Sequence, residues 1–410
     1  ARIDDAVRRF LRAKIRWGLL ERGKPSSRVE SAQMAVFNSQ EHKELAREAV
    51  RKSLVLLKNN GKVLPVSPKS RVLVAGDGAD NIAKQAGGWS VSWQGTDNTN
   101  ADFPNATSVY AGLRQQIEAA GGTVELSVDG KYRSKPDVAI VVIGEEPYAE
   151  WFGDIQQLEY QHGNKRDLAL LQRLKQQNIP VVTVFLSGRP LWVNKELNAS
   201  DAFVAAWLPG SEGQGIADVL LTDSKGNIQH DFSGKLSFSW PRRADQYTNN
   251  VGQPGYDPQF AYGYGLTYAR NARVGLLSED SGVANAGGSL DRYFVDGRFV
   301  APWSLMLRDA GGDFRLGAEK SGASPRGGVS ARSTDGAGQE SARALTFSQG
   351  GGQALIAAQP VDLTRQSNGE MAIAFRYRVD ARAQGPVFLT LGAGSVDITS
   401  LVNAAPVGEW

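Results

Sequence analysis

Residues 1–57 contain two stretches in which apolar residues recur every three or four positions. This spacing predicts two amphipathic helices, at about 1–20 and 39–57, joined by a linker over 26–37. One helix cannot bury its own apolar stripe, so we expect the first to pack on a segment upstream of Ala1. Because the chain starts inside a helical pattern and stops without a tail, we expect it to be part of a longer protein.

From residue 71 to about 240, short apolar runs alternate with helical patterns. Buried parallel strands read as nearly continuous apolar segments, and such runs predict strands at 71–75, 123–128, 137–143, 181–186, 202–208 and 235–240. Helical spacing predicts helices around 109–117, 168–174 (capped by Asn164) and 212–222. The alternation indicates an α/β domain with a mostly parallel sheet covered by helices.

The pattern changes again beyond residue 268. Glycine, serine, alanine and asparagine predominate at first, which predicts a linker that we place at 269–285. The period then becomes two, as in the alternation over 373–379, and short strands also fit 293–295, 344–347 and 387–391. These features predict an all-β domain of the sandwich type.

Composition excludes several classes of function. The net charge is +3, from 46 basic and 43 acidic side chains, which is too balanced to indicate a nucleic-acid partner. No apolar stretch is long enough to predict a membrane span. Cysteine is absent, so thiol catalysis, zinc–thiolate sites and disulfides are impossible. His42, His162 and His230 lack metal-binding spacing, and we expect neither a metal nor a cofactor.

The acidic loop, residues 144–154, combines four carboxylates with three aromatic rings. It directly follows the predicted strand at 137–143, and open parallel sheets bind ligands beyond the carboxyl ends of their strands. A carboxylic acid can protonate a departing sugar oxygen, and flat rings can stack on a pyranose. The loop therefore indicates sugar chemistry, and the alternative interpretation is a solvated acidic surface loop.

The tryptophan loop, residues 87–95, follows the predicted strand at 71–75 and carries Trp89 and Trp93 between glycines. Two rings four residues apart suit a wall on which a sugar stacks, although both could instead belong to the core. Residues 76–78 lack the third glycine of a dinucleotide fingerprint. Residues 210–215 lack the Gly-x-Ser-x-Gly spacing of a nucleophile elbow.

Several segments together resemble family 3 glycoside hydrolases. Residues 2–9 resemble the end of that family's N-terminal barrel, and residues 45–59 resemble its linker helix. The tryptophan and acidic loops resemble its tryptophan-bearing and acid/base loops. The resemblance covers roughly residues 1–268 and extends to short motifs at 187–190, 205–210 and 263–266.

The resemblance implies a domain organisation. Residues 62–268 would form a six-stranded, mostly parallel α/β sandwich. Before it would come the truncated end of a barrel at 1–28, then a linker and helix at 29–61. Residues 286–410 resemble the extra jelly-roll-like β-sandwich of larger bacterial exo-glucanases in the family, here truncated.

The resemblance also assigns roles in the site. Glu150 would be the general acid/base, and Glu145 and Glu146 would either be structural or support the residues that contact the substrate. Trp93 would form one wall of the site beyond the cleaved bond, and Trp89 and Trp151 would be further substrate-binding residues. A general acid must begin protonated, so we expect the surroundings of Glu150 to raise its pKa. Trp151 and Phe152 would desolvate Glu150, and the carboxylates at 145, 146 and 154 would repel its negative charge.

In the family that this chain resembles, the nucleophile is an aspartate of the N-terminal barrel, so the resemblance implies that this chain lacks it. The expected parent is a retaining, exo-acting β-glucosidase or β-glucanase that releases glucose from non-reducing ends, and the chain alone should be inactive. Its substrate would be a β-glucan or a cello- or laminari-oligosaccharide, its partner the missing barrel, and its location periplasmic or extracellular. A β-xylosidase-type specificity and a non-catalytic carbohydrate-binding or scaffold protein are the alternatives.

Overall fold

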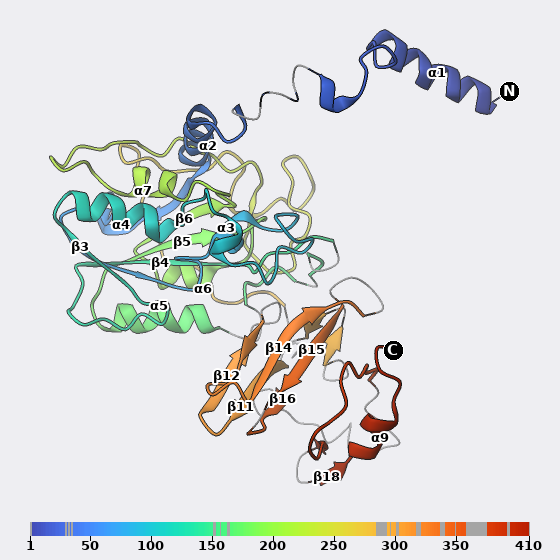
Figure 1. The fold of residues 1–410 in the computed structure, drawn as a ribbon. Helices are drawn as coiled ribbons and strands as arrows, with labels where there is room; N and C mark the ends of the chain where they lie inside the picture. The colour runs from blue at the N-terminus through green and yellow to red at the C-terminus, as the bar shows by residue number, and fades with distance from the viewer. Residues whose placement is uncertain are drawn as a thin grey trace. The chain divides into compact units, whose positions relative to one another are not determined.

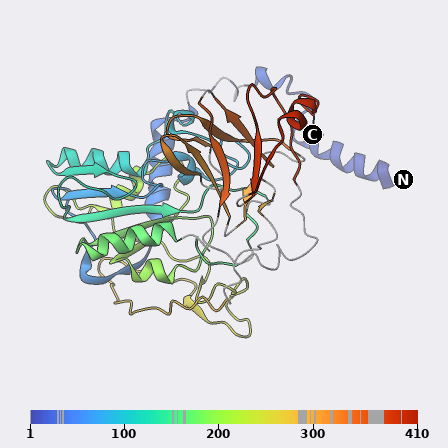
Figure 2. The same ribbon diagram turned by 90° about the horizontal axis from the view of Figure 1, so that it is seen from below.

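The computed structural model of the chain is shown in Figures 1 and 2. It describes every residue except 1, 29–30, 32, 34–35, 151–152, 156, 162–164, 284–292, 296, 301–302, 317–320, 337–340, 349, 358–374, 392–393 and 410. The chain forms two compact units. The first comprises residues 1–87, 99–145 and 167–281, and the second comprises 88–98, 146–166 and 282–410.

A six-stranded sheet forms the centre of the first unit, in the order β1-β6-β5-β4-β2-β3. Its strands are β1 (Val55–Asn59), β2 (Arg71–Ala75), β3 (Thr123–Leu126), β4 (Val138–Gly144), β5 (Val181–Leu186) and β6 (Ala202–Trp207). The edge strand β1 runs antiparallel to β6, and the other neighbouring pairs are parallel. The predicted six-stranded, mostly parallel sheet is confirmed.

One of the six predicted strands is wrong, and another takes its place. The helix predicted to reach residue 57 ends at Ser53, as α2 (Gln40–Ser53), and the chain continues as β1. All five residues of β1 are buried, and a helix at the edge of a domain buries only one face. The run at 235–240 lies outside the sheet; only Trp240 is extended, in β7 (Trp240–Pro241), which pairs with β8 (Pro258–Phe260).

Helices cover both faces of the sheet (Figures 1 and 2). On one face α2 packs with α4 (Val109–Ala119) and α7 (Gln214–Leu220), and alternate residues of the central strands face them. On the other face lie α5 (Arg166–Gln176) and the short α6 (Asn194–Asn198). The helices predicted around 109–117, 168–174 and 212–222 are present. The predicted cap Asn164 lies outside the described residues.

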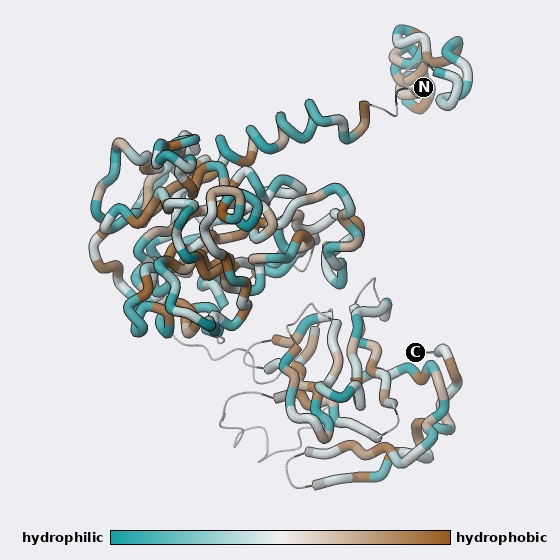
Figure 3. The backbone as a smooth tube through the Cα atoms, turned by 60° about the vertical axis from the view of Figure 1, so that its left-hand side comes forward, coloured by the Kyte–Doolittle hydropathy of each residue, from teal (hydrophilic) through white to brown (hydrophobic). Residues whose placement is uncertain are grey.

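Helix α1 (Arg2–Arg16) confirms the first predicted helix. Its apolar residues alternate with polar ones along the tube in Figure 3 and remain exposed, for example Ile3 at 79% and Phe10 at 64%. The expectation that this stripe packs on an upstream segment stays a prediction. Among the described residues, no helix combines the length and apolar character needed to cross a membrane.

Asparagine side chains hold the start of the predicted linker on the first unit. The Asn60 side chain donates to the Val274 carbonyl and accepts from its N–H, at 2.8 and 3.0 Å. Asn198 makes the same pair of bonds with Leu277, at 2.9 and 3.0 Å. Each amide bonds to both the N–H and the C=O of one residue, as a neighbouring β-strand would. These four bonds hold Val274 and Leu277 in an ordered position on the first unit.

The second unit contains the predicted all-β domain. Its short strands are β9 (Phe294–Val295), β10 (Arg298–Phe299), β11 (Ser304–Asp309), β12 (Gly312–Leu316), β13 (Gly322–Ala323), β14 (Val329–Thr334), β15 (Ala342–Phe347), β16 (Gln353–Ala357), β17 (Phe388–Leu391) and β18 (Gly394–Asp397). They form small antiparallel sheets such as β12-β11-β16 and β13-β14-β15. A buried apolar cluster lies between them, at Leu305, Leu307, Leu316, Val329 and Ala331.

The alternating pattern over 373–379 does not mark a regular strand in the described residues. Positions 373 and 374 lie outside them, and residues 375–378 carry no strand pairing. Val379 makes a single parallel bridge with Val407, just beyond the short helix α9 (Thr399–Ala404). Phe375 is 58% exposed, so the period-two pattern here does not correspond to a buried face.

Candidate functional site

Strands β2 and β4 are parallel neighbours, so their carboxyl ends lie at one edge of the sheet. The acidic loop begins at the end of β4, and the tryptophan loop follows the short helix α3 (Ile82–Ala86) that comes after β2. The buried Lys84 ammonium lies 2.8 Å from Asp77 Oδ1 and 3.2 Å from the Gly144 carbonyl oxygen. A buried charge must be paired. Through these two contacts, Lys84 connects α3 to Gly144, the first residue of the acidic loop.

The first carboxylate of the acidic loop is held within the first unit. The Ser187 hydroxyl donates to Glu145 Oε2 at 2.7 Å, and Arg189 Nε donates to Oε1 at 3.0 Å. Both carboxylate oxygens of Glu145 are thus engaged by the segment that follows β5. This geometry suits a structural role for Glu145.

In the second unit, Glu150 lies beside both indole rings of the tryptophan loop. Trp93 Nε1–H donates to Glu150 Oε2 at 2.6 Å. The Trp89 and Trp93 ring centroids are 6.2 Å apart, with their planes inclined by 54°. Trp89 is 70% exposed and Trp93 is half-buried, so the alternative that both rings belong to the core is wrong.

The structure therefore brings together three of the four predicted site residues, Glu150, Trp93 and Trp89. The fourth, Trp151, lies outside the described residues. The side chain of Glu150 is exposed and is not held in an internal ion pair in the described part of the chain. An exposed carboxylate beside two accessible indoles can exchange a proton with a ligand that stacks on the rings.

A buried amide joins the two loops and was missed by the sequence analysis. Gln94 Oε1 accepts a hydrogen bond from the Ala149 N–H at 2.7 Å, and its Nε2 donates to the Glu150 carbonyl at 3.0 Å. Gln94 is fully buried. Its amide therefore fixes the position of the backbone at Ala149 and Glu150. A glutamine after a tryptophan carries no periodic signal, so only its burial identifies it.

The two loops also touch directly through their backbones. A Cβ atom added to Gly88 would lie 2.0 Å from the carbonyl oxygen of Tyr148, closer than any side chain allows. Glycine is required here because the approach leaves no room for a side chain. The path of the tryptophan loop is thus matched to that of the acidic loop.

The tryptophan loop, and Asp97 two residues beyond it, have a strained backbone. Trp89, Val91 and Asp97 have positive φ angles of 58°, 65° and 61°. Residues with side chains rarely adopt this conformation, least of all β-branched ones such as valine, and such strain persists only where the surroundings impose it. Part of the restraint is internal, because the Asn98 amide donates to the Ser90 carbonyl at 3.0 Å.

The expectation of a raised pKa for Glu150 is wrong for this chain. The Trp93 indole N–H holds the pKa of Glu150 below its usual value, with smaller contributions from a backbone bond and from Trp89. Hydrogen bonds donated to an ionised carboxylate stabilise it, and burial opposes this little because Glu150 is exposed. Trp151 and Phe152, which were expected to desolvate it, lie outside the described residues.

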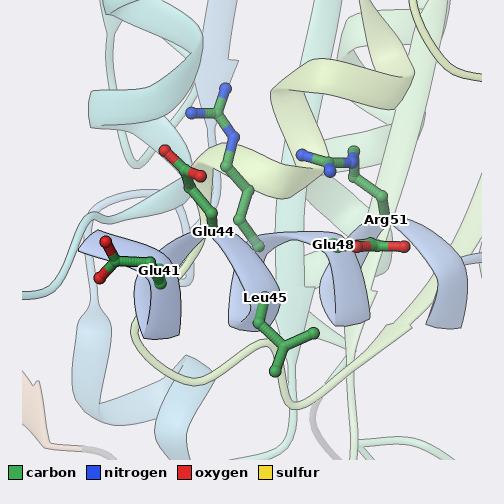
Figure 4. Close-up of a pocket in the computed structure, with 6 residues that line it drawn as sticks. Glu41, Glu44, Leu45, Glu48 and Arg51 are labelled. Carbon is green, nitrogen blue, oxygen red and sulfur yellow. The ribbon is translucent and has the colours of Figure 1, made fainter. Parts of the chain in front are cut away.

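A surface depression on α2 is a poorer candidate (Figure 4). It is lined by Glu41, Glu44, Leu45, Arg47, Glu48 and Arg51. Its arginines are already engaged, since Arg47 Nε lies 2.6 Å and Arg51 Nη1 3.0 Å from Asp218 Oδ2. They hold α2 against α7, which leaves an acidic helix surface with no group aimed at a ligand. In the described parts of the chain, no cluster of acidic residues and histidine could hold a metal ion.

Two family models and several known proteins match parts of the chain. Residues 54–268, more than half of the chain, match the model of the glycosyl hydrolase family 3 C-terminal domain, and residues 301–410 match a galactose-binding domain-like model. The crystal structure of the exo-1,3/1,4-β-glucanase from a Pseudoalteromonas species is similar, with 51% identity and a TM-score of 0.68. The match covers 98% of this chain and 50% of that one.

Two curated proteins are also similar. The lysosomal β-glucosidase of Dictyostelium discoideum is 33% identical over 65% of this chain and 34% of its own length. The periplasmic β-glucosidase of Salmonella typhimurium is 26% identical over 65% of this chain and 40% of its own length. The chain thus spans between a third and a half of the length of these three proteins.

Proposed function

The chain belongs to glycoside hydrolase family 3, and from this premise we propose that it is the acid/base-bearing part of a β-glucosidase or exo-β-glucanase. The observation that carries the proposal is the exposed carboxylate of Glu150, oriented by the Trp93 indole N–H at 2.6 Å. The second indole, Trp89, offers an exposed ring beside it. This pairing suits a proton donor next to a sugar-stacking surface.

In the proposed mechanism, a domain upstream of this chain supplies an aspartate that attacks the anomeric carbon. Glu150 protonates the departing oxygen and then takes a proton from the water that releases the sugar with retained configuration. The two carboxyl groups would lie about 5–5.5 Å apart. That second carboxylate and the bound sugar would raise the pKa of Glu150, opposing the effect of the indole.

The proposed substrate is a β-glucan, or a cello- or laminari-oligosaccharide, from whose non-reducing end glucose is released. The similar Pseudoalteromonas protein, described as an exo-1,3/1,4-β-glucanase, supports this choice. We propose a periplasmic or extracellular location, which the similarity to a periplasmic β-glucosidase supports.

The 410 residues alone are expected to show no glucosidase activity. The nucleophile and the groups that hold the cleaved sugar would lie upstream, so this chain would contribute only the proton donor. The measurement is release of an aryl leaving group from aryl β-glucosides, by the chain alone and by the protein with its upstream sequence. Activity of both, or of neither, would contradict the proposal; a non-catalytic carbohydrate-binding protein would show activity in neither.

Replacing Trp93 by phenylalanine in the whole enzyme is expected to shift the alkaline limb of the rate profile to higher pH. The indole N–H lowers the pKa of Glu150, so its loss raises that pKa and keeps the acid protonated to a higher pH. The measurement is kcat/KM for a poorly activated glucoside against pH. A shift to lower pH would argue against the hydrogen bond.

Replacing Trp93 by alanine removes the ring as well. We expect KM to rise more for a disaccharide than for an aryl monosaccharide, because only the disaccharide places a second sugar on the proposed wall. Equal increases for both substrates would show that the ring does not bind that sugar.

A further inference from the structure

One contact links Asp97, two residues beyond the tryptophan loop, to a residue far along the chain. Asp97 Oδ1 accepts two hydrogen bonds from Ser321, from its backbone N–H at 2.8 Å and from its hydroxyl at 2.7 Å. Ser321 immediately precedes β13 and belongs to the C-terminal β-domain, 224 residues beyond Asp97. All of these residues lie in the second unit.

Because of the position of Asp97, this contact restrains the tryptophan loop. Asp97 is one of the three residues held at positive φ, and it lies between Thr96 and Asn98. Both neighbours bind the first half of the loop: the Ser92 hydroxyl donates to the Thr96 carbonyl at 3.0 Å, and the Asn98 amide donates to the Ser90 carbonyl at 3.0 Å. A restraint on Asp97 therefore also stabilises these two bonds, which join residues 96 and 98 to residues 92 and 90.

The next links lead to the proposed acid/base. Ser92 precedes Trp93, whose indole N–H binds the Glu150 carboxylate, and Gln94 follows, whose amide binds the Glu150 backbone. The strain at Trp89 and Val91 opposes this loop conformation, so contacts from outside the loop must help to maintain it. A charge-assisted pair of bonds to one carboxylate oxygen is among the stronger contacts available for this purpose.

We propose that Asp97 and Ser321 are positioning residues, through which the C-terminal β-domain fixes the tryptophan loop and thereby orients Glu150. This rests on the proposed role of Glu150 as general acid/base. The β-domain would then act on turnover without itself touching the sugar that is cleaved.

The principal test replaces Asp97 by glycine in the whole enzyme. Glycine tolerates positive φ, so the variant removes both bonds to Ser321 without adding strain. We expect kcat/KM for poorly activated glucosides to fall about tenfold, the equivalent of one charge-assisted hydrogen bond. Activated aryl glucosides, which need less help from the acid, should be affected less. Asp97→Asn keeps an acceptor and tolerates the left-handed conformation, so it should restore most of the rate.

A second readout does not depend on catalysis. The indole N–H resonance of Trp93 in the 410-residue chain, assigned with Trp93→Phe, should move towards that of a water-exposed indole in Asp97→Gly. Ser321→Ala, which removes one bond from an exposed side chain, should shift it part of the way. Asp380→Ala is the control, because it removes an exposed carboxylate of the same unit that pairs with Arg378 at 2.7 Å. It should change neither the resonance nor the rate.

The outcomes separate this inference from the proposed function. If Glu150→Gln abolishes turnover of poor substrates while Asp97→Gly changes neither the Trp93 resonance nor the rate, the positioning role is wrong. If Asp97→Gly shifts the resonance but Glu150→Gln leaves turnover intact, the loop is positioned as inferred and the acid/base assignment is wrong. An equal loss for Asp97→Gly and Asp380→Ala would indicate a general effect of charge and would also overturn the inference.

Discussion

Glu150→Gln in the whole enzyme should lower turnover of poorly activated β-glucosides by about 10²–10⁴-fold, the usual contribution of general acid–base catalysis. Glutamine preserves the size of the side chain and can still accept the Trp93 hydrogen bond, so the site should keep its shape. What is lost is the proton for the departing oxygen and the base that activates water. The measurement is kcat on a series of glucosides whose leaving groups differ in pKa.

Two controls sharpen this prediction. A small anionic nucleophile such as azide should partly restore turnover of activated glucosides, because it attacks the glycosyl-enzyme without a general base. Glu146→Gln removes a carboxylate from the same loop and should retain turnover. Unchanged turnover in Glu150→Gln, or an equal loss in Glu146→Gln, would remove Glu150 from the proposed role.

Gln94→Leu should be nearly as damaging, although this side chain need never touch the substrate. The change leaves the Ala149 N–H and the Glu150 carbonyl, both partly buried, without their partner, at about 1 kcal/mol for each lost bond. Glu150 would lose the support of its backbone, and misplacement of a catalytic group by about 1 Å can cost about 10²-fold in rate. The measurements are kcat for a poor substrate and the free energy of unfolding.

Gln94→Glu is the matched variant. A carboxylate still accepts from the Ala149 N–H but cannot, when ionised, donate to the Glu150 carbonyl, so one of the two bonds survives. The losses of rate and of stability in Gln94→Glu should therefore be smaller than those in Gln94→Leu. If burial disfavours the ionised form of the new side chain, these losses should occur only at high pH, because the protonated carboxyl group can still donate. A Gln94→Leu enzyme with normal turnover would show that the amide does not position Glu150.

The sequence predicted the α/β domain well because its strands are apolar runs of the kind that only a buried parallel sheet accommodates. The segment Val55–Asn59 misled the analysis, since Leu54 and Leu57 continued the spacing of α2. Pairing with β6 decides that segment, and the pairing partner lies about 145 residues away. The reverse error occurred at 235–240, where only Trp240 lies in a strand and pairs with Phe260 of β8, outside the six-stranded sheet.

The pKa of Glu150 shows a different kind of limit. The loop composition, with its aromatic rings and other carboxylates, indicated a raised pKa because proximity in sequence was taken as proximity in space. In the structure Glu145 is bound by Ser187 and Arg189, and the carboxylate of Glu150 instead accepts a hydrogen bond from another loop. A single indole N–H reverses the direction that composition suggests.

By itself the sequence determined the class of the fold, the family, and the two loops in which the chemistry should lie, because these depend on local periodicity and on short runs of residue types. Tertiary structure alone decided which carboxylates are bound internally, that Gln94 and Gly88 fit the two loops to each other, and that Ser321 reaches Asp97. Such contacts join residues from tens to hundreds of positions apart, and their energies depend on distances of a few ångströms that no local pattern encodes.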